Sequence, residues 1–315
     1  MGQQVKAGLA AARADKLFFY SPYNFLRKLD AEVQQHLFGT GQAERYAAGI
    51  THHVFEFQSE GHTVQFLYEF LAWDTEFFQA PVYKLFTLLF AENTLASVLV
   101  AASVAFRQQL RERGGAYCFA ELPAEDIHVI QALGGAGWHL VETRLTYFQD
   151  SVATFEHPRY SVRSAWPEEA EAIGQISAGA RNNYDRFHAE RWFDAGKGDQ
   201  FLARYASGAV NGYCDDVLVP NEPNVPVDSF VAISDLSAHR ASLGSGVSRV
   251  VLAAVGPANR GWHLKLVAET LQRARAMSVG YVLMTTQATN RAVFRTCEKL
   301  DFKLGGTGCI LACSL

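Results

Sequence analysis

The stretch that decides the fold is Val247-Ser-Arg-Val-Val-Leu-Ala-Ala-Val-Gly-Pro-Ala-Asn-Arg-Gly-Trp-His-Leu-Lys-Leu-Val267. Its first nine residues are mostly apolar and rich in valine, which predicts a buried strand over Val247 to Val255. Pro257 to Gly261 predicts a loop, because proline and glycine interrupt regular structure there. Apolar residues then recur at helical spacing, which predicts a helix from Trp262 to Met277.

Downstream, Tyr281 to Thr286 predicts a second strand, and Asn290 to Leu300 predicts a second helix with Asn290 at its N-cap. The first helix thus follows a strand directly. Backbone N–H groups at a helix N-terminus lack intrahelical acceptors, and the helix dipole favours negative charge. The loop at Arg260-Gly261 therefore suits a phosphate, although each piece alone could be an ordinary strand or turn.

This stretch resembles the acyl-donor motif of GNAT (GCN5-related N-acetyltransferase) enzymes, V-x-P-x-x-R-G-x-G-x-G/A. Val255, Pro257, Arg260 and Gly261 match the motif. The segment from Thr286 to Phe302 resembles the closing motif of the same superfamily, which ends in E-K-L-G-F. The resemblance implies an α/β (α+β) GNAT fold with a central mixed, mostly antiparallel sheet flanked by helices, and acetyl-CoA as co-substrate.

The resemblance also implies which residues contact the donor. The implied cofactor-binding residues are Ala253, Ala254, Val255, Arg260, Gly261, Trp262, His263, Leu264, Lys265 and Asn290. His263 and Lys265 stand where the motif usually has glycine; Lys265 could contact a phosphate, whereas His263 would crowd the backbone. Cys297 stands where many members carry a tyrosine that protonates the departing thiolate. It is the candidate catalytic residue, as general acid or as a small apolar spacer.

Two further elements resemble the two-domain TDP-fucosamine acetyltransferases: Leu71-Ala-Trp-Asp-Thr-Glu-Phe-Phe78 and Asn182-Asn-Tyr-Asp-Arg-Phe-His-Ala-Glu190. The implied acceptor is the amino group of a nucleotide-linked (TDP) amino-dideoxy sugar. The implied substrate-binding residues are Tyr184, Arg186, Phe187 and His188. Arg186 could equally form a structural ion pair, and His188 could equally be a core histidine whose hydrogen bonds are made within the protein. The aromatic residues of the Leu71–Phe78 element are more typical of a buried contact between domains than of a catalytic site, so Asp74 is not an expected base.

The implied mechanism is direct attack of a neutral amine on the acetyl carbonyl, without a serine or cysteine nucleophile. Backbone N–H groups would polarise the carbonyl where the strand splays after Ala253 to Val255. Candidates for the proton acceptor are His188, Asp235 and His239, which the spacing does not rank.

A chain of 315 residues is long enough for two domains. A helix over Asp30 to Phe38 and a strand over Val54 to Gln58 lie in an N-terminal extension, residues 1–60. Residues 61–152 predict a smaller α/β domain with a helix over Leu95 to Arg113. The linker falls near 152–159, and residues 160–315 predict the GNAT domain, in which Cys214 to Val219 and Ser229 to Ser234 pair as a hairpin.

Composition excludes several classes of protein. The formal net charge of −4 comes without a basic stripe, so nucleic acid is not an expected partner. No apolar run reaches the ~18 residues that span a bilayer, and the N-terminus lacks a signal-peptide pattern, so we expect no membrane contact and a cytoplasmic protein. Five scattered cysteines predict free thiols and no metal site.

Two alternatives to a sugar acetyltransferase stay open. One is a degenerate GNAT domain that binds a ligand or partner without catalysis, prompted by His263, Lys265 and Cys297. The other is an acetyltransferase for another small amine, a peptide N-terminus or an antibiotic, because fold does not fix the substrate. A cysteine hydrolase fits poorly, and the resemblance suggests a homodimer.

Overall fold

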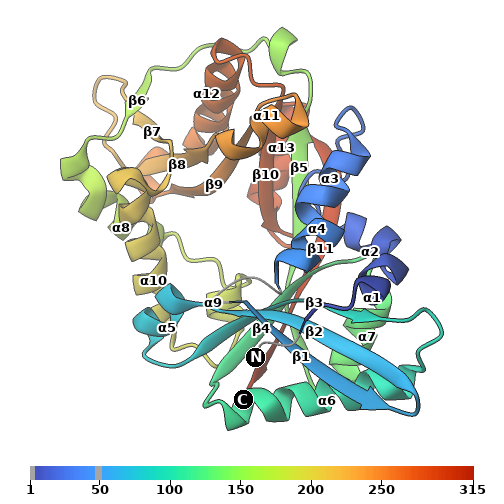
Figure 1. The fold of residues 1–315 in the computed structure, drawn as a ribbon. Helices are drawn as coiled ribbons and strands as arrows, with labels where there is room; N and C mark the ends of the chain where they lie inside the picture. The colour runs from blue at the N-terminus through green and yellow to red at the C-terminus, as the bar shows by residue number, and fades with distance from the viewer. Residues whose placement is uncertain (1–3, 47–51) are drawn as a thin grey trace. The chain divides into compact units, whose positions relative to one another are not determined.

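The computed structural model describes residues 4–46 and 52–315, which form two compact units. The first contains the chain up to Thr143 together with Thr307–Leu315, and the second contains Arg144–Gly306. Both units combine a mixed sheet with flanking helices, as the sequence predicts (Figure 1). No helix in the described part of the chain is long and apolar enough to cross a membrane.

The first unit is a sheet in the order β1-β2-β3-β4-β11. Within the described residues, β3 and β4 pair in parallel and the other neighbouring strands of this unit are antiparallel. The strands are β1 (His52–Ser59), β2 (His62–Phe70), β3 (Val82–Phe90), β4 (Tyr117–Pro123) and β11 (Lys303–Ser314). The helices are α1 (Ala7–Ala12), α2 (Ala14–Phe18), α3 (Ala31–Phe38), α4 (Thr40–Arg45), α5 (Ala72–Phe78), α6 (Ala96–Glu112) and α7 (Ile127–Gly135).

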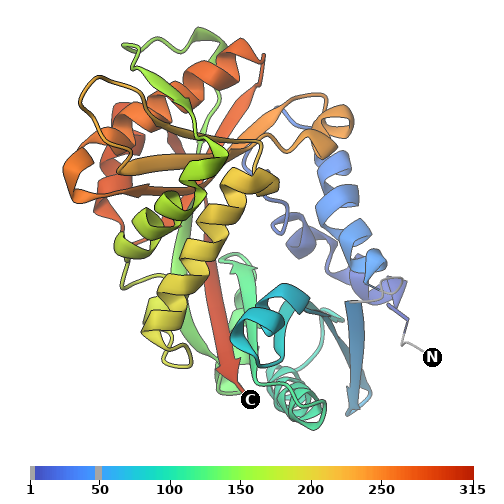
Figure 2. The same cartoon turned by 90° about the vertical axis from the view of Figure 1, so that its left-hand side faces the viewer.

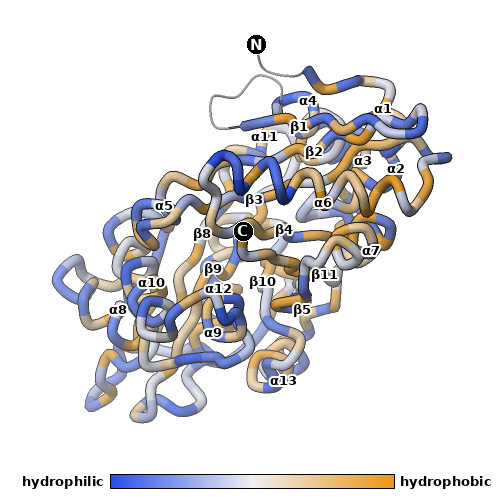
Figure 3. The backbone as a smooth tube through the Cα atoms, turned by 90° about the horizontal axis from the view of Figure 1, so that it is seen from below, coloured by the Kyte–Doolittle hydropathy of each residue, from blue (hydrophilic) through white to orange (hydrophobic). Residues whose placement is uncertain are grey.

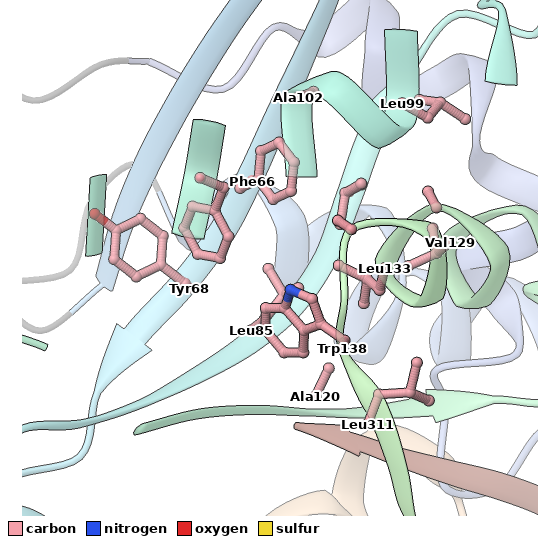
Figure 4. Packing of buried hydrophobic residues seen from close by; sticks show 14 of the residues in the cluster. Phe66, Tyr68, Leu85, Leu99, Ala102, Ala120, Val129, Leu133, Trp138 and Leu311 are labelled. Atoms are coloured by element: carbon pink, nitrogen blue, oxygen red, sulfur yellow. The ribbon is translucent and has the colours of Figure 1, made fainter. Parts of the chain in front are cut away.

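Aromatic and aliphatic side chains fill the core of this unit between the sheet, α6 and α7 (Figure 4). The rings of Phe66 on β2 and Phe106 on α6 stack with centroids 4.5 Å apart. Leu311 of the last strand packs in the same cluster as Trp138. The final residues of the chain are therefore part of the first unit's core.

The second unit has the strand order β5-β10-β9-β8-β7-β6. Its strands are β5 (His139–Gln149, from Arg144), β6 (Val162–Ser164), β7 (Asp216–Pro220), β8 (Ser229–Ser234), β9 (Val247–Val255) and β10 (Tyr281–Gln287). β9 and β10 are parallel, and the other neighbouring strands of this unit are antiparallel. The predicted 247–255 strand and the predicted hairpin are confirmed.

Helices cover both faces of this sheet. On one face, α12 (Trp262–Ala276) and α13 (Arg291–Lys299) pack on Val231, Ile233 and Val250. On the other, α8 (Ala170–Gly179) and α10 (Ala195–Gly208) run side by side over Phe230 and Ala232 (Figure 2). Hydrophobic and hydrophilic residues alternate along α13, as expected for a helix with one buried face (Figure 3).

Each unit's sheet takes one strand from the other half of the chain. β11 follows α13 of the second unit, but its residues Gly308–Ser314 pair with β4 of the first unit. β5 follows α7 of the first unit, but its residues Arg144–Gln149 pair with β10. Residues 307–315 therefore lie outside the second compact unit, whereas the sequence-based division places them in the 160–315 domain. Strand pairing over such sequence distances cannot be predicted from local periodicity.

Candidate active site

The two central strands of the second unit separate at their carboxyl ends. β10 pairs with β9 only from Tyr281↔Val247 to Met284↔Val250, while β9 continues to Val255. The register with β8 shifts between Ala232 and Ile233, so that Val251 is an extra residue on β9. Such a bulge increases the local twist. The separation thus begins at Val250, earlier than the predicted Ala253–Val255, and the β9 backbone beyond it has no partner on β10 within the described residues.

The loop after β9 is fixed by the segment that precedes β8. The backbone N–H of Ala258 donates to the Asp228 carboxylate over 2.8 Å, and that of Gly256 donates to the Asp228 carbonyl over 2.7 Å. A Cβ at Gly256 would lie 2.0 Å from the Asp228 carboxylate. Asn259 is buried and donates to the Pro226 carbonyl and the Ser229 hydroxyl. The loop is therefore held in one shape before any ligand binds.

This loop ends at an uncapped helix N-terminus. Gly261 is the N-cap of α12 with φ +92°, a conformation that favours glycine, and no side chain caps the helix. The first-turn N–H groups consequently lack acceptors in the helix. Arg260 is exposed, and no described residue forms an ion pair with it. Free N–H groups beside an unpaired guanidinium form an arrangement suited to phosphate.

His263 is turned toward the next helix. Its Nδ1 lies 2.8 Å from the Thr296 hydroxyl of α13. Burial lowers the pKa of His263 to about 4, so its imidazole is neutral at pH 7. The predicted crowding by His263 is therefore relieved by its engagement with α13.

Lys265 is also engaged by the protein. Its ammonium lies 3.1 Å from a carboxylate oxygen of Glu222 and 4.3 Å from the centroid of the Trp262 ring. Trp262 is buried, and Leu264 packs at the edge of the same core. The predicted phosphate contact of Lys265 would require it to leave Glu222, which makes Arg260 the more available cation.

The two residues predicted on α13 have structural roles here. Asn290 caps the helix by accepting a hydrogen bond from the Val293 N–H over 3.3 Å. Cys297 is fully buried in the apolar core with Met284 and Phe302. Burial raises the pKa of Cys297 to about 12. A thiol in this position fits the spacer role rather than the general acid, because it is shielded from solvent and its pKa is raised.

The predicted acceptor element lies at the carboxyl end of β10. Asn182 donates from its side-chain amide to the Gln287 side chain over 2.8 Å. Tyr184 is 62% exposed beside it. The structure thus brings the element that includes α9 (Arg186–Ala189) to the place where β9 and β10 separate.

Within that element, His188 is a satisfied buried histidine. Its Nδ1 lies 2.9 Å from the Asp185 carboxylate and its Nε2 lies 2.9 Å from that of Asp199. The hydrogen bond from Arg181 lowers the pKa of Asp199 despite partial burial, and His188 adds to this effect. Phe187 packs on Phe201 with ring centroids 4.3 Å apart. Both nitrogens of His188 are occupied, which counts against its predicted role as base or substrate contact.

Arg186 is buried with its guanidinium 4.6 Å from the Phe187 centroid.

Asp235 is held by both terminal nitrogens of Arg273, each over 2.8 Å, and by Ser248. Burial alone would raise the pKa of Asp235, but these hydrogen bonds outweigh it and lower the pKa. Asp235 is therefore a structural ion-pair partner, and His239 lies in the short turn Ser237–His239.

The first unit repeats this arrangement with one difference. β3 and β4 pair in parallel only over Val82–Leu85 and Tyr117–Ala120 and then separate. Here Arg13 bridges the two ends: its guanidinium lies 4.3 Å from the Phe90 centroid and binds the carboxylate of Asp126, the N-cap of α7. Tyr20 also donates to Asp126, over 2.6 Å. The N-terminal segment thus fills the position that is open in the second unit.

Sequence reasoning missed Arg249 on β9, Tyr205 on α10, and Tyr213, whose ring contacts that of Tyr205. The sequence does single out Arg249, because its positive charge interrupts the mostly apolar strand Val247–Val255. Among the described residues, no group of three or more His, Cys, Asp or Glu side chains could hold a metal ion.

No family model matches the sequence, and a search of curated proteins finds no match. Solved structures are similar. A GCN5-related N-acetyltransferase from Sphaerobacter thermophilus has 10% identity and a TM-score of 0.57, covering 100% of this chain and 95% of its own. A tandem GNAT protein from the clavulanic acid biosynthesis pathway has 13% identity and a TM-score of 0.50, covering 98% and 97%.

A GCN5-related glucosamine N-acetyltransferase region of a fungal GH3 β-N-acetylglucosaminidase has 11% identity and a TM-score of 0.57, covering 96% of this chain and 37% of its own. At such identities the likeness concerns the fold. This chain therefore has the GNAT fold, a mixed sheet flanked by helices, as do GCN5-related N-acetyltransferases of the tandem kind.

Proposed function

We propose that this chain is an acetyl-CoA-dependent N-acetyltransferase whose donor site lies in the second unit. The observation that carries the proposal is the combination of the open β9 edge, the fixed loop and the uncapped α12 N-terminus beside Arg260. Arg260 and the N–H groups of residues 261–264 would hold the pyrophosphate. The β9 backbone from Val251 to Val255 would hold the amide-bearing arm of the donor.

The residues present fit direct transfer to an amine. Acetyl-CoA supplies an activated acetyl group as a thioester. The N–H groups of the free β9 edge can donate to the carbonyl oxygen, on which negative charge develops during attack. The fixed loop reduces the cost of ordering the donor. Because Asp235 and His188 are engaged by protein partners, we propose that water takes the proton from the acceptor ammonium.

The acceptor is proposed to be a small amine at the α8/α10 side of the separated strands. A TDP-linked amino-dideoxy sugar is the more specific candidate, supported by the Leu71–Phe78 and Asn182–Glu190 elements and by the position of Asn182 beside Gln287. The engagement of His188 by two carboxylates does not add to that support.

The burial of Cys297 favours the second candidate, a domain that binds acetyl-CoA without turnover. A thermal-shift titration separates these readings. Acetyl-CoA at 100 times its Kd should stabilise the wild type by about 2.7 kcal/mol. Arg260→Glu should lose most of the shift, whereas Arg27→Glu, an exposed control in the first unit, should keep it. Thiol release on addition of TDP-amino sugars or other amines then supports catalysis, and binding without release supports the second candidate.

A further inference from the structure

Arg249 occupies the middle of β9, opposite Ser234 on β8 and Leu283 on β10. The next residue, Val250, packs in the core with α12. Because side chains alternate along a strand, Arg249 points to the other face, where α8 and α10 lie. Leu283 and Thr285 of β10 share that face, since Val282 and Met284 pack with α12.

Within residues 4–46 and 52–315, the guanidinium of Arg249 has no counter-ion. Its Nε is buried and has no hydrogen-bond partner, and no described residue forms an ion pair with it. Two buried or half-buried arginines of this unit behave differently: Arg163 and Arg273 each make a two-pronged contact with a carboxylate. A half-buried cation without a partner is unfavourable unless an anion reaches it from outside.

Tyr205 lies near this cation, and Tyr213 lies beside Tyr205. Tyr205 of α10 and Tyr213 of the π-helical turn η3 (Ala209–Tyr213) contact edge to face, with centroids 5.2 Å apart. Burial and the neighbouring Tyr213 raise the pKa of Tyr205, and the charge of Arg249 opposes that rise. The Tyr205 hydroxyl is therefore a protonated donor near a guanidinium. Tyr213 is 67% exposed beside Tyr205.

We propose that Arg249, assisted by the hydroxyls of Tyr205 and Tyr213, binds a carboxylate or phosphate group of the amine acceptor. This inference rests on the proposed acetyltransferase function and narrows its substrate class to anionic amines. At ~3.3 Å per residue, Arg249 lies about 7 to 13 Å along β9 from Val251–Ala253, where the strands separate. An acceptor of the size of a sugar phosphate spans that distance.

The test uses matched probes on the full chain saturated with CoA, so that the donor site is already filled. Calorimetric titrations compare glucosamine 6-phosphate with glucosamine for the phosphate arm, and 6-aminohexanoate with hexylamine for the carboxylate arm. We expect one anionic probe to bind the wild type at least tenfold more tightly than its neutral partner. Arg249→Gln should remove that preference, and Tyr213→Phe should reduce it severalfold.

Arg249→Lys, which keeps the charge, should retain part of the preference and so separates a charge effect from a folding defect. Arg27→Gln is the exposed control. Equal or no binding of the anionic and neutral probes in the wild type, or an unchanged preference in Arg249→Gln, would overturn the inference. Failure of CoA itself to bind would instead contradict the proposed function.

Discussion

His263 and Lys265 occupy positions on α12 that the donor motif usually gives to glycine, yet each has a protein partner away from its own turn. Thr296, the partner of His263, lies 33 residues downstream, and Glu222, the partner of Lys265, lies 43 residues upstream. Such partners cannot be predicted from one sequence, because nothing local to the motif encodes them. The motif residues themselves were predictable; the side-chain directions were not.

Because His263 is neutral in its desolvated site, the free energy of unfolding should depend on pH. In the unfolded chain this histidine takes up a proton near pH 6.5, whereas in the folded chain it does so near pH 4. The free energy of unfolding should thus fall as pH falls from 6.5 to 4, by about 3 kcal/mol from this residue. His263→Gln, which can still bond to Thr296, should flatten that part of a plot of unfolding free energy against pH. An unchanged slope would show that His263 is not buried neutral.

Cys297 should matter for packing and little for chemistry. Cys297→Ala should lower the free energy of unfolding by about 1 to 2 kcal/mol by leaving a small cavity, and should keep kcat within about threefold. Cys297→Ser should be less stable still, since a buried hydroxyl lacks a partner. A fall in kcat of about a hundredfold in both variants, measured by thiol release, would restore Cys297 as the general acid.

At the scale of elements, periodicity predicted most of the second unit. The predicted strand over 247–255 and the observed β9 have the same bounds, and the helix after Gly261 begins at Trp262 as expected. Asp30 caps α3 with its side chain, which confirms the predicted helix there. Local patterns sufficed because each element carries its own cap or turn residues. The bulge at Val251 and the exchange of β5 and β11 depend on pairing between distant strands, so they were not predictable.

The fixed loop between β9 and α12 gives an element-scale prediction. Gly256→Ala should push the Asp228 carboxylate off the Ala258 N–H, because the added Cβ would lie 2.0 Å from it. We expect acetyl-CoA affinity to fall about tenfold, as preorganisation is lost. Gly208→Ala is the matched control, since open space surrounds that glycine in α10. Equal affinities of the two variants would mean that the loop's shape does not matter for the donor.

At the scale of the whole molecule, two units share one order of elements but differ at the separated strands. In the first unit, Arg13, Tyr20 and Asp126 occupy that position, and the loop before α6 contains acidic Glu92 in place of an Arg-Gly pair. The N-terminal extension, for which the sequence predicted no role, thus completes the first unit. We infer that the second unit alone carries the donor site.

Arg13→Ala should test this division of roles. Removing Arg13 leaves the buried Asp126 carboxylate without its cation, with only the Tyr20 hydrogen bond remaining among the contacts described above, and should destabilise the protein by about 3 to 5 kcal/mol. Acetyl-CoA affinity, measured below the variant's melting temperature, should stay within about twofold of the wild type. A large loss of affinity without loss of stability would place the donor in the first unit.

The most direct test of the account is a calorimetric titration of acetyl-CoA onto the wild type and the Arg260→Glu variant. We expect one binding site per chain in the wild type and at least tenfold weaker binding in Arg260→Glu, because a carboxylate beside the α12 N-terminus repels phosphate. No binding at millimolar acetyl-CoA, two sites per chain, or binding that Arg260→Glu leaves unchanged would contradict it.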